Sequence, residues 1–199
     1  MEDPFDDFEE DGTDTVFRDV IMLALIGFVA MVIMLLPHIS REKQETKDDN
    51  APGNVIVEMH WPSDMENDVD LWVKAPGEGP VGFWNQGGEV FNLLRDDLGA
   101  IGDATDENYE VSYSRGIPSG EYIVNVHMYG PPPQGRAIPV KVVVSVKKPR
   151  EDTRQILETT VELRRYNQEE TAFRFRLSAE GDLVENSVST LRYPLITGR

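Results

Sequence analysis

Cysteine is absent from this 199-residue chain, so the protein forms no disulfide, has no cysteine nucleophile and binds no metal through thiolates. Histidine is scarce as well. His38, His60 and His127 are scattered along the sequence, and none has the spacing of a zinc site. A nucleophile elbow of the form G-x-S-x-G, a Walker loop and a dinucleotide-binding fingerprint are also missing. These absences argue against an enzyme.

Basic residues are few relative to acidic ones, 19 against 36, and the formal net charge is -17. A surface with this excess of negative charge repels phosphate backbones. The composition therefore argues against nucleic acid as a partner. The length allows about one domain of ordinary size together with a membrane anchor.

One long apolar run stands near the beginning of the chain. Residues 20–36 carry no charge, and at about 1.5 Å per residue they extend roughly 26 Å, the lower limit for a bilayer core. Adding Val16 and Phe17 lengthens the run and places Asp19 inside it. The run is preceded by acidic rather than basic residues and ends in LLPHIS rather than in a small-residue cleavage site. We therefore expect an uncleaved transmembrane helix over residues 16–37.

Polar segments flank this span. Residues 1–15 are strongly acidic and contain Pro4 and Gly12, which favours a disordered tail. Residues 38–53 are polar and end in Pro52 and Gly53, as expected of a linker between a membrane helix and a domain.

From residue 54 the pattern changes to short runs in which apolar and polar residues alternate, rich in β-branched and aromatic side chains and bounded by Gly, Pro and Asn. This pattern predicts an all-β domain over residues 54–199, an antiparallel β-sandwich with its core at 54–149. Two further runs predict an added C-terminal hairpin over 154–178. In the second run Phe173, Phe175 and Leu177 alternate with Arg174 and Arg176, which predicts one apolar face and one basic face.

The loops of this domain are rich in acidic and amide side chains. Ca²⁺ takes six to eight oxygen ligands, which such loops can supply if they meet at one end of the sandwich. The candidate ligands are Asp68, Asp70, Asn85, Asp96 and Asp97. Their spacing matches no EF-hand, and acidic loops are common in a chain this anionic. A structural Ca²⁺ site and a set of solvated loop charges are both compatible with the sequence.

The middle of the domain, from Trp61 to about Val146, is similar to a family of bacterial extracytoplasmic β-sandwich domains of poorly defined function. The pattern runs D-x-D-L-x-V-x-x-P, an Asn, a Gly-Gly, a D-D-x-G, an N-x-E and a final P-x-G-x-Y. The matching residues are Asp68, Asp70, Leu71, Pro76, Asn85, Gly87, Gly88, Asp96, Asp97, Gly99, Asn108, Glu110, Pro118, Gly120 and Tyr122. The resemblance implies an interaction module and names no ligand.

Asp19 is the residue of the span that needs an explanation. A carboxylate at membrane depth costs a few kcal/mol, so it tends to face protein or a water-filled cavity. On a helix Asp19 shares a face with Leu23, Ile26 and Ala30. The small residue Gly27 lies near that face, and small residues let another helix approach closely. The other interpretation is that Asp19, next to Arg18, only marks the membrane surface and points to water.

The order of residues in DVIMLALIGFVAMV resembles the single transmembrane helix of the ExbD/TolR family and, more distantly, that of MotB-type flagellar stator subunits. The residues that carry the resemblance are Asp19, Val20, Met22 or Leu23, Leu25, Phe28 and Pro37. The family also has a short cytoplasmic tail, one span, a linker and a periplasmic domain.

This resemblance implies a subunit of a proton-driven motor in a bacterial inner membrane. Asp19 would be the proton-carrying carboxylate, with Leu23, Ile26, Gly27, Phe28 and Ala30 forming the channel-facing or helix-packing surface. Two copies would sit inside a pentamer of a multi-span partner that resembles TolQ, ExbB or MotA, and the C-terminal domain would act on an envelope target. The alternative is a membrane-anchored binding module of the cell envelope that transports no ion.

The orientation of the span is open. The family resemblance and the type of sandwich favour a cytoplasmic N-terminus and a periplasmic domain. The basic residues point the other way, because Arg41, Lys43 and Lys47 follow the span whereas Arg18 alone precedes it.

Overall fold

The computed structural model describes residues 11–39, 53–98, 107–132 and 135–196. They form two units, an N-terminal helix and a β domain.

The helix α1 spans Asp11–Ile39, and its segment Val16–Met34 is long and apolar enough to cross a membrane. It confirms the predicted apolar helix but begins earlier than expected, so residues 11–15 are helical rather than disordered. Pro37 lies within the last turn. Its backbone has no N–H and cannot donate a hydrogen bond within the helix, and the helix ends two residues later, at Ile39. Residues 1–10 and 40–52 of the expected tail and linker lie outside the described residues.

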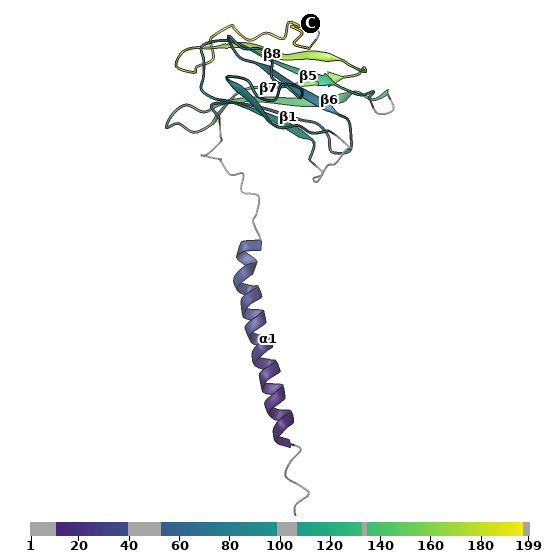
Figure 1. Cartoon of the computed structure of the whole chain (residues 1–199), viewed down its shortest axis with the longest axis vertical. Helices are drawn as coiled ribbons and strands as arrows, with labels where there is room; N and C mark the ends of the chain where they lie inside the picture. Colours follow the sequence, from purple (N-terminus) through teal and green to yellow (C-terminus); the bar gives the residue numbers. More distant parts are fainter. Residues whose placement is uncertain (1–10, 40–52, 99–106, 133–134, 197–199) are drawn as a thin grey trace, which may run out of the picture. The chain divides into compact units, whose positions relative to one another are not determined.

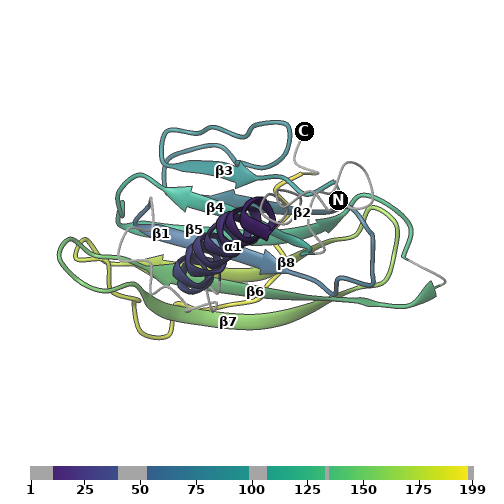
Figure 2. The same cartoon turned by 90° about the horizontal axis from the view of Figure 1, so that it is seen from below.

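The β domain is a sandwich of two antiparallel sheets, as predicted (Figure 1). The five-stranded sheet has the order β3-β4-β1-β6-β7, and the three-stranded sheet has the order β2-β5-β8. The bounds are β1 Val55–His60, β2 Val69–Lys74, β3 Phe91–Arg95, β4 Tyr109–Ser114, β5 Gly120–Met128, β6 Ile138–Val146, β7 Arg154–Leu163 and β8 Glu169–Leu177. Figure 2 shows β3 and β7 at opposite edges of the five-stranded sheet.

The core lies between the two sheets and is built from alternate residues of the strands, the spacing at which side chains share one face. Val55, Val57 and Met59 of β1 are fully buried in it, as are Leu71 and Val73 of β2. The predicted apolar face of β8 belongs to the same core and contributes Phe173, Phe175 and Leu177. The alternation read from the sequence thus identifies the inner face of each of these strands.

The predicted C-terminal hairpin was wrong in its pairing. Both strands exist, β7 and β8, but β7 pairs with β6 in one sheet and β8 pairs with β5 in the other. The short connection between them therefore crosses from one sheet to the other. Leu163 at the end of β7 and Phe173 on β8 both belong to the core between the sheets, to which the two strands contribute from opposite sides.

A second, smaller apolar cluster lies on the outer face of the three-stranded sheet. Trp72 and Ile123 pack there against Leu195 of the C-terminal segment. Gly82 covers the Trp72 ring so closely that a Cβ at position 82 would lie 2.4 Å from a ring carbon. A side chain at this position is therefore excluded by the packing of the tryptophan.

Substitution of Gly82 by Ala tests this packing. We expect Gly82→Ala to lower the free energy of unfolding by about 1–3 kcal/mol, because the added methyl group must displace the buried ring. Gly79→Ala is the matched control, since a Cβ there meets no atom within 4 Å. Urea unfolding of the full chain in detergent micelles, followed by tryptophan fluorescence, measures both, and equal midpoints for the two variants would contradict the explanation.

Candidate functional site

The two sheets are joined by a buried carboxylate. Glu110 projects from β4 of the five-stranded sheet, and its side chain is fully shielded from solvent. Its Oε2 accepts a hydrogen bond of 2.7 Å from the backbone N–H of Leu71 on β2, an edge strand of the other sheet. Its Oε1 accepts a hydrogen bond of 3.1 Å from the backbone N–H of Asp97, just after β3. One carboxylate therefore contacts both sheets and a loop.

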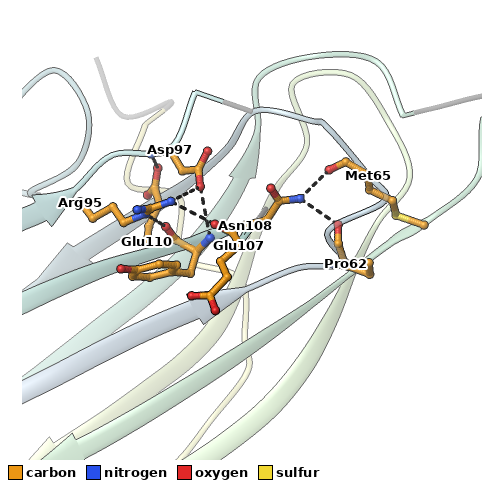
Figure 3. A network of polar contacts seen from close by, with 8 residues as sticks. Pro62, Met65, Arg95, Asp97, Glu107, Asn108 and Glu110 are labelled. Atoms are coloured by element: carbon orange, nitrogen blue, oxygen red, sulfur yellow. Dashed lines mark hydrogen bonds and ion pairs between the residues drawn. The ribbon is translucent and has the colours of Figure 1, made fainter. Parts of the chain in front are cut away.

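Arg95 and Asp97 hold the loop after β3 in place (Figure 3). The Arg95 guanidinium donates to Asp97 Oδ2 at 3.1 Å and to the backbone carbonyl oxygens of Tyr109 and Glu107. Asp97 Oδ2 also accepts the N–H of Tyr109 at 3.3 Å. The loop is thus fastened to the start of β4, beside Glu110.

Asn108 fastens a second loop at the same end of the sandwich (Figure 3). Its side-chain amide donates to the carbonyl oxygens of Pro62 at 2.8 Å and Met65 at 2.9 Å. The N-x-E signal of the sequence, Asn108 and Glu110, therefore consists of two residues that fix the backbone around one site.

Carboxylates from three places in the sequence meet beside Glu110. One oxygen from each of Asp70, Asp96 and Glu110 lies within 4.8 Å of the other two. Asp68 is close enough to interact electrostatically with Asp70 and Asp96. We call Asp68, Asp70, Asp96 and Glu110 the carboxylate cluster. Among the described residues, the buried Oδ1 atoms of Asp68 and Asp96 have no hydrogen-bond partner.

The surroundings of the cluster favour the protonated, neutral form of its carboxyl groups. Burial raises the pKa of Asp68 to about 6, and the carboxylates of Asp70 and Asp96 add to this shift. Burial also raises the pKa of Glu110 well above its ordinary range, although the N–H groups of Leu71 and Asp97 favour the ionised form. Burying several carboxylates together is costly unless protons or a cation neutralise them.

His127 supplies one positive partner. Burial lowers the pKa of this histidine, but hydrogen bonds from Nδ1 to Asp70 Oδ2 and from Nε2 to Asn167 Oδ1, both 2.8 Å, outweigh that effect and raise it. Burial raises the pKa of Asp70, against the opposing effect of His127. Because each ring nitrogen faces an acceptor, the geometry favours the imidazolium form, which balances one negative charge of the cluster.

The structure brings together most of the predicted Ca²⁺ ligands. Asp68, Asp70 and Asp96 belong to the cluster, and Asp97 lies next to it but is bound to Arg95. Asn85 lies in a turn and its side chain donates to the carbonyl oxygen of Pro80 in its own loop.

Sequence reasoning did not assign Glu110 or His127 to this site. Glu110 lies on the inward face of β4, opposite Met59 of β1, and His127 lies between Val126 and Met128 near the end of β5. A charged or ionisable residue at a buried strand position was the available signal for both.

Any two of the three carboxylate oxygens are close enough to contact one cation, because two oxygens that each lie about 2.4 Å from an ion are separated by at most about 4.8 Å. Each oxygen of Glu110 accepts one backbone hydrogen bond and retains a second lone pair. The donor set is all oxygen, which suits a hard cation.

The predicted residues of the span all lie on the surface of α1. Asp19, Leu23, Ile26 and Ala30 share one helical face. Leu23, Ile26 and Phe28 are exposed, and a Cβ added at Gly27 would meet no atom within 4 Å.

Comparison with protein-family models, with curated proteins and with solved structures finds no match to this chain.

The raised pKa of Asp68 predicts a pH dependence of stability. A carboxyl with a pKa of about 6 in the folded state and about 4 in the unfolded state stabilises the fold fully below pH 4, and this contribution is lost as the pH rises through 6. Asp68→Asn cannot ionise. We expect the variant to gain unfolding free energy relative to the native chain as the pH rises from about 4 to about 6.

Urea unfolding of the full chain in micelles, with a metal chelator present, measures this difference. Asp64→Asn is the matched control because Asp64 is exposed. Parallel pH curves for the native chain and Asp68→Asn would contradict the electrostatic account of the cluster.

Proposed function

We propose that this chain is the single-span subunit of a proton-driven motor in a bacterial inner membrane, with Asp19 as its proton carrier. The observation that carries the proposal is one carboxylate, Asp19, within the apolar helical segment Val16–Met34. Arg18 and Asp19 are the charged residues of that segment.

The energetic argument begins with the cost of Asp19. A carboxylate at the centre of a membrane helix costs about 2.5–3.5 kcal/mol on insertion scales, less near the surface, and is tolerated where it faces protein or water. In a membrane Asp19 would therefore need a protein neighbour or a water-filled path. A multi-span membrane protein of the TolQ, ExbB or MotA type would supply one and would keep the carboxylate in a confined aqueous path.

The surface of the helix supports close packing with such a partner. The face of Asp19, Leu23, Ile26 and Ala30 is flanked by Gly27, beside which the helix surface is open. Small residues at a helix surface allow another backbone to approach closely. Asp19 would alternate between its protonated and ionised forms, and the β domain on the periplasmic side would transmit the resulting movement to an envelope target.

Asp19→Asn tests the motor proposal. The full chain is purified from its native membranes with the proteins bound to it, and proton flux is measured after reconstitution into lipid vesicles. We expect a multi-span partner in the complex and at least a tenfold loss of flux in Asp19→Asn, since an amide binds no proton at physiological pH, with expression unchanged.

Asp14→Asn is the matched control, because Asp14 precedes the apolar segment Val16–Met34. It is expected to leave the flux unchanged. A chain that purifies without a multi-span partner, or an Asp19→Asn complex with native flux, would overturn the proposal.

The second candidate function is a membrane-anchored binding module that holds Ca²⁺ in the carboxylate cluster. The observation in favour is the pair of buried oxygens of Asp68 and Asp96, which have no hydrogen-bond partner among the described residues and lie near the fully buried Glu110. A divalent cation would satisfy these oxygens, balance the buried charge and tie β2, β4 and the loop after β3 to one another. In this function α1 is only an anchor.

Calcium titration tests the second candidate. We expect Ca²⁺ at a hundred times its dissociation constant to add about 2.7 kcal/mol to the unfolding free energy of the full chain in micelles. Asp96→Asn removes a ligand and should abolish this increment, whereas the exposed control Asp64→Asn should keep it. Equal stability with Ca²⁺ and with chelator would exclude the site.

A further inference from the structure

The C-terminal segment, residues 190–196, lies across the outer face of the three-stranded sheet. Just before it, Ser189 pairs with the edge of β8, where Ser189 and Arg174 exchange two backbone hydrogen bonds of 2.8 and 2.7 Å. Figure 1 shows the last described part of the chain, in yellow, beside β5 and β8. Beyond Ser189 the segment makes no backbone–backbone hydrogen bond with any described residue. Its position is therefore fixed by side chains.

Three buried side chains of the sheet hold the backbone of the C-terminal segment. Asn125 of β5 donates an amide N–H to the carbonyl oxygen of Tyr193 at 2.8 Å, and Thr171 Oγ1 of β8 accepts the N–H of Tyr193 at 2.9 Å. Glu169 Oε1 accepts the N–H of Leu195 at 2.6 Å and that of the next residue at 3.2 Å. These contacts are made to backbone groups that every residue except proline carries, so they suit an extended peptide of another sequence as well.

An apolar site lies next to these backbone contacts. Leu195 packs there against Trp72 of β2 and Ile123 of β5, and Phe83 is partly buried against the same cluster. Trp72 and Asn125 are directly opposite each other in the pairing of β2 with β5, so the apolar site adjoins the side chain that holds Tyr193. The outer face of the sheet thus offers both backbone hydrogen bonds and a place for one aliphatic side chain.

Exposed aromatic rings continue this apolar surface. The Trp84 ring lies 4.3 Å from that of Trp72 and 4.5 Å from that of Phe83, and the Tyr129 ring lies 6.0 Å from that of Phe83. Trp84 remains 49% exposed and Tyr129 56% exposed. Large aromatic side chains with this much exposure are typical of surfaces that bind another molecule.

The C-terminal segment leaves polar groups beneath it unsatisfied. Among the described residues, seven buried side-chain atoms have no hydrogen-bond partner, and four of them belong to side chains that contact this segment. These four are the donors Trp72 Nε1 and Arg174 Nε and the acceptors Asn125 Oδ1 and Glu169 Oε2. A buried polar group without a partner costs free energy. A ligand with additional polar groups would therefore suit this face better than the chain's own segment does.

We infer that this face binds an extended peptide segment of a partner protein, and that the C-terminal segment occupies the site until such a partner displaces it. The partner would use the same backbone contacts and place an aliphatic side chain on Trp72 and Ile123. A neighbouring Ser, Thr, Asn or Gln would supply hydrogen bonds that the C-terminal segment lacks. The exposed rings of Trp84 and Tyr129 let a longer partner bind before the segment leaves. The inference rests on the β domain alone, so its failure would leave both functions proposed above unaffected.

Binding of a free peptide tests this inference. The probe is a fluorescently labelled peptide with the sequence of residues 189–196, and its anisotropy is measured with the full chain in micelles. Leu195→Ala removes the apolar contact of the C-terminal segment with Trp72 and Ile123, and far-UV circular dichroism verifies that the variant is folded. We expect the peptide to bind at least tenfold more tightly to Leu195→Ala than to the native chain, because the native segment competes from within the same molecule.

Leu191→Ala is the matched control, because Leu191 is 73% exposed and its loss should leave the affinity unchanged. Tyr193→Ala weakens the segment at an exposed ring that lies near Lys74 and Arg174, and it should also tighten peptide binding. A peptide methylated at the amide nitrogen of its second leucine cannot donate to Glu169 and should bind Leu195→Ala at least tenfold more weakly. Equal affinity of the native chain and both tightening variants, undiminished binding of the methylated peptide, or stronger binding of the oligosaccharide cellohexaose than of the peptide would overturn the inference.

Discussion

The carboxylate of Glu110 is the interaction on which the end of the sandwich depends. It is fully buried, it accepts one N–H from β2 and one from the loop after β3, and it projects from the opposite sheet. A buried carboxylate is stable only when hydrogen bonds, protons or a cation compensate for lost hydration. Two hydrogen bonds compensate in part. The same requirement shapes the surroundings, where His127 pairs with Asp70 and Arg95 pairs with Asp97.

The buried carboxylates at this end of the domain fall into two groups, those that are paired with a positive side chain and those that are not. Positive side chains neutralise Asp70 and Asp97, whereas Asp68 and Asp96 each keep a buried oxygen without a partner among the described residues. A core selected for stability alone would replace such groups by apolar ones, because buried charge rarely improves stability. The proposed Ca²⁺ would relieve these unfavourable electrostatics. In the proposed motor subunit the Asp19 carboxylate poses a similar problem, because a charge at membrane depth needs a partner or water.

Much of the fold can be predicted from the alternation of apolar and polar residues along the sequence. Val55, Val57 and Met59 predicted the inner face of β1, and Phe173, Phe175 and Leu177 predicted that of β8, because period two reports which side of a strand is buried. The partner of each strand was harder to predict. β7 and β8 are joined by a short turn and suggested a hairpin, but hydrophobic periodicity carries no information about which sheet a strand joins. The site was predicted in part. The aspartates were identified from the acidic segments of the sequence, whereas Glu110 and His127 lie within strands and were not assigned to the site.

The sequence by itself determined the apolar helix, the all-β domain, the absence of thiol chemistry and the identity of most acidic residues at the site, because these depend on composition and local periodicity. The tertiary structure decided which carboxylates meet and which strand edges are covered by other described segments of the chain. These features depend on contacts between residues far apart in the chain, such as Leu71 with Glu110 and Arg174 with Ser189. Such contacts arise from the packing of whole sheets, and a local pattern of residues does not encode them.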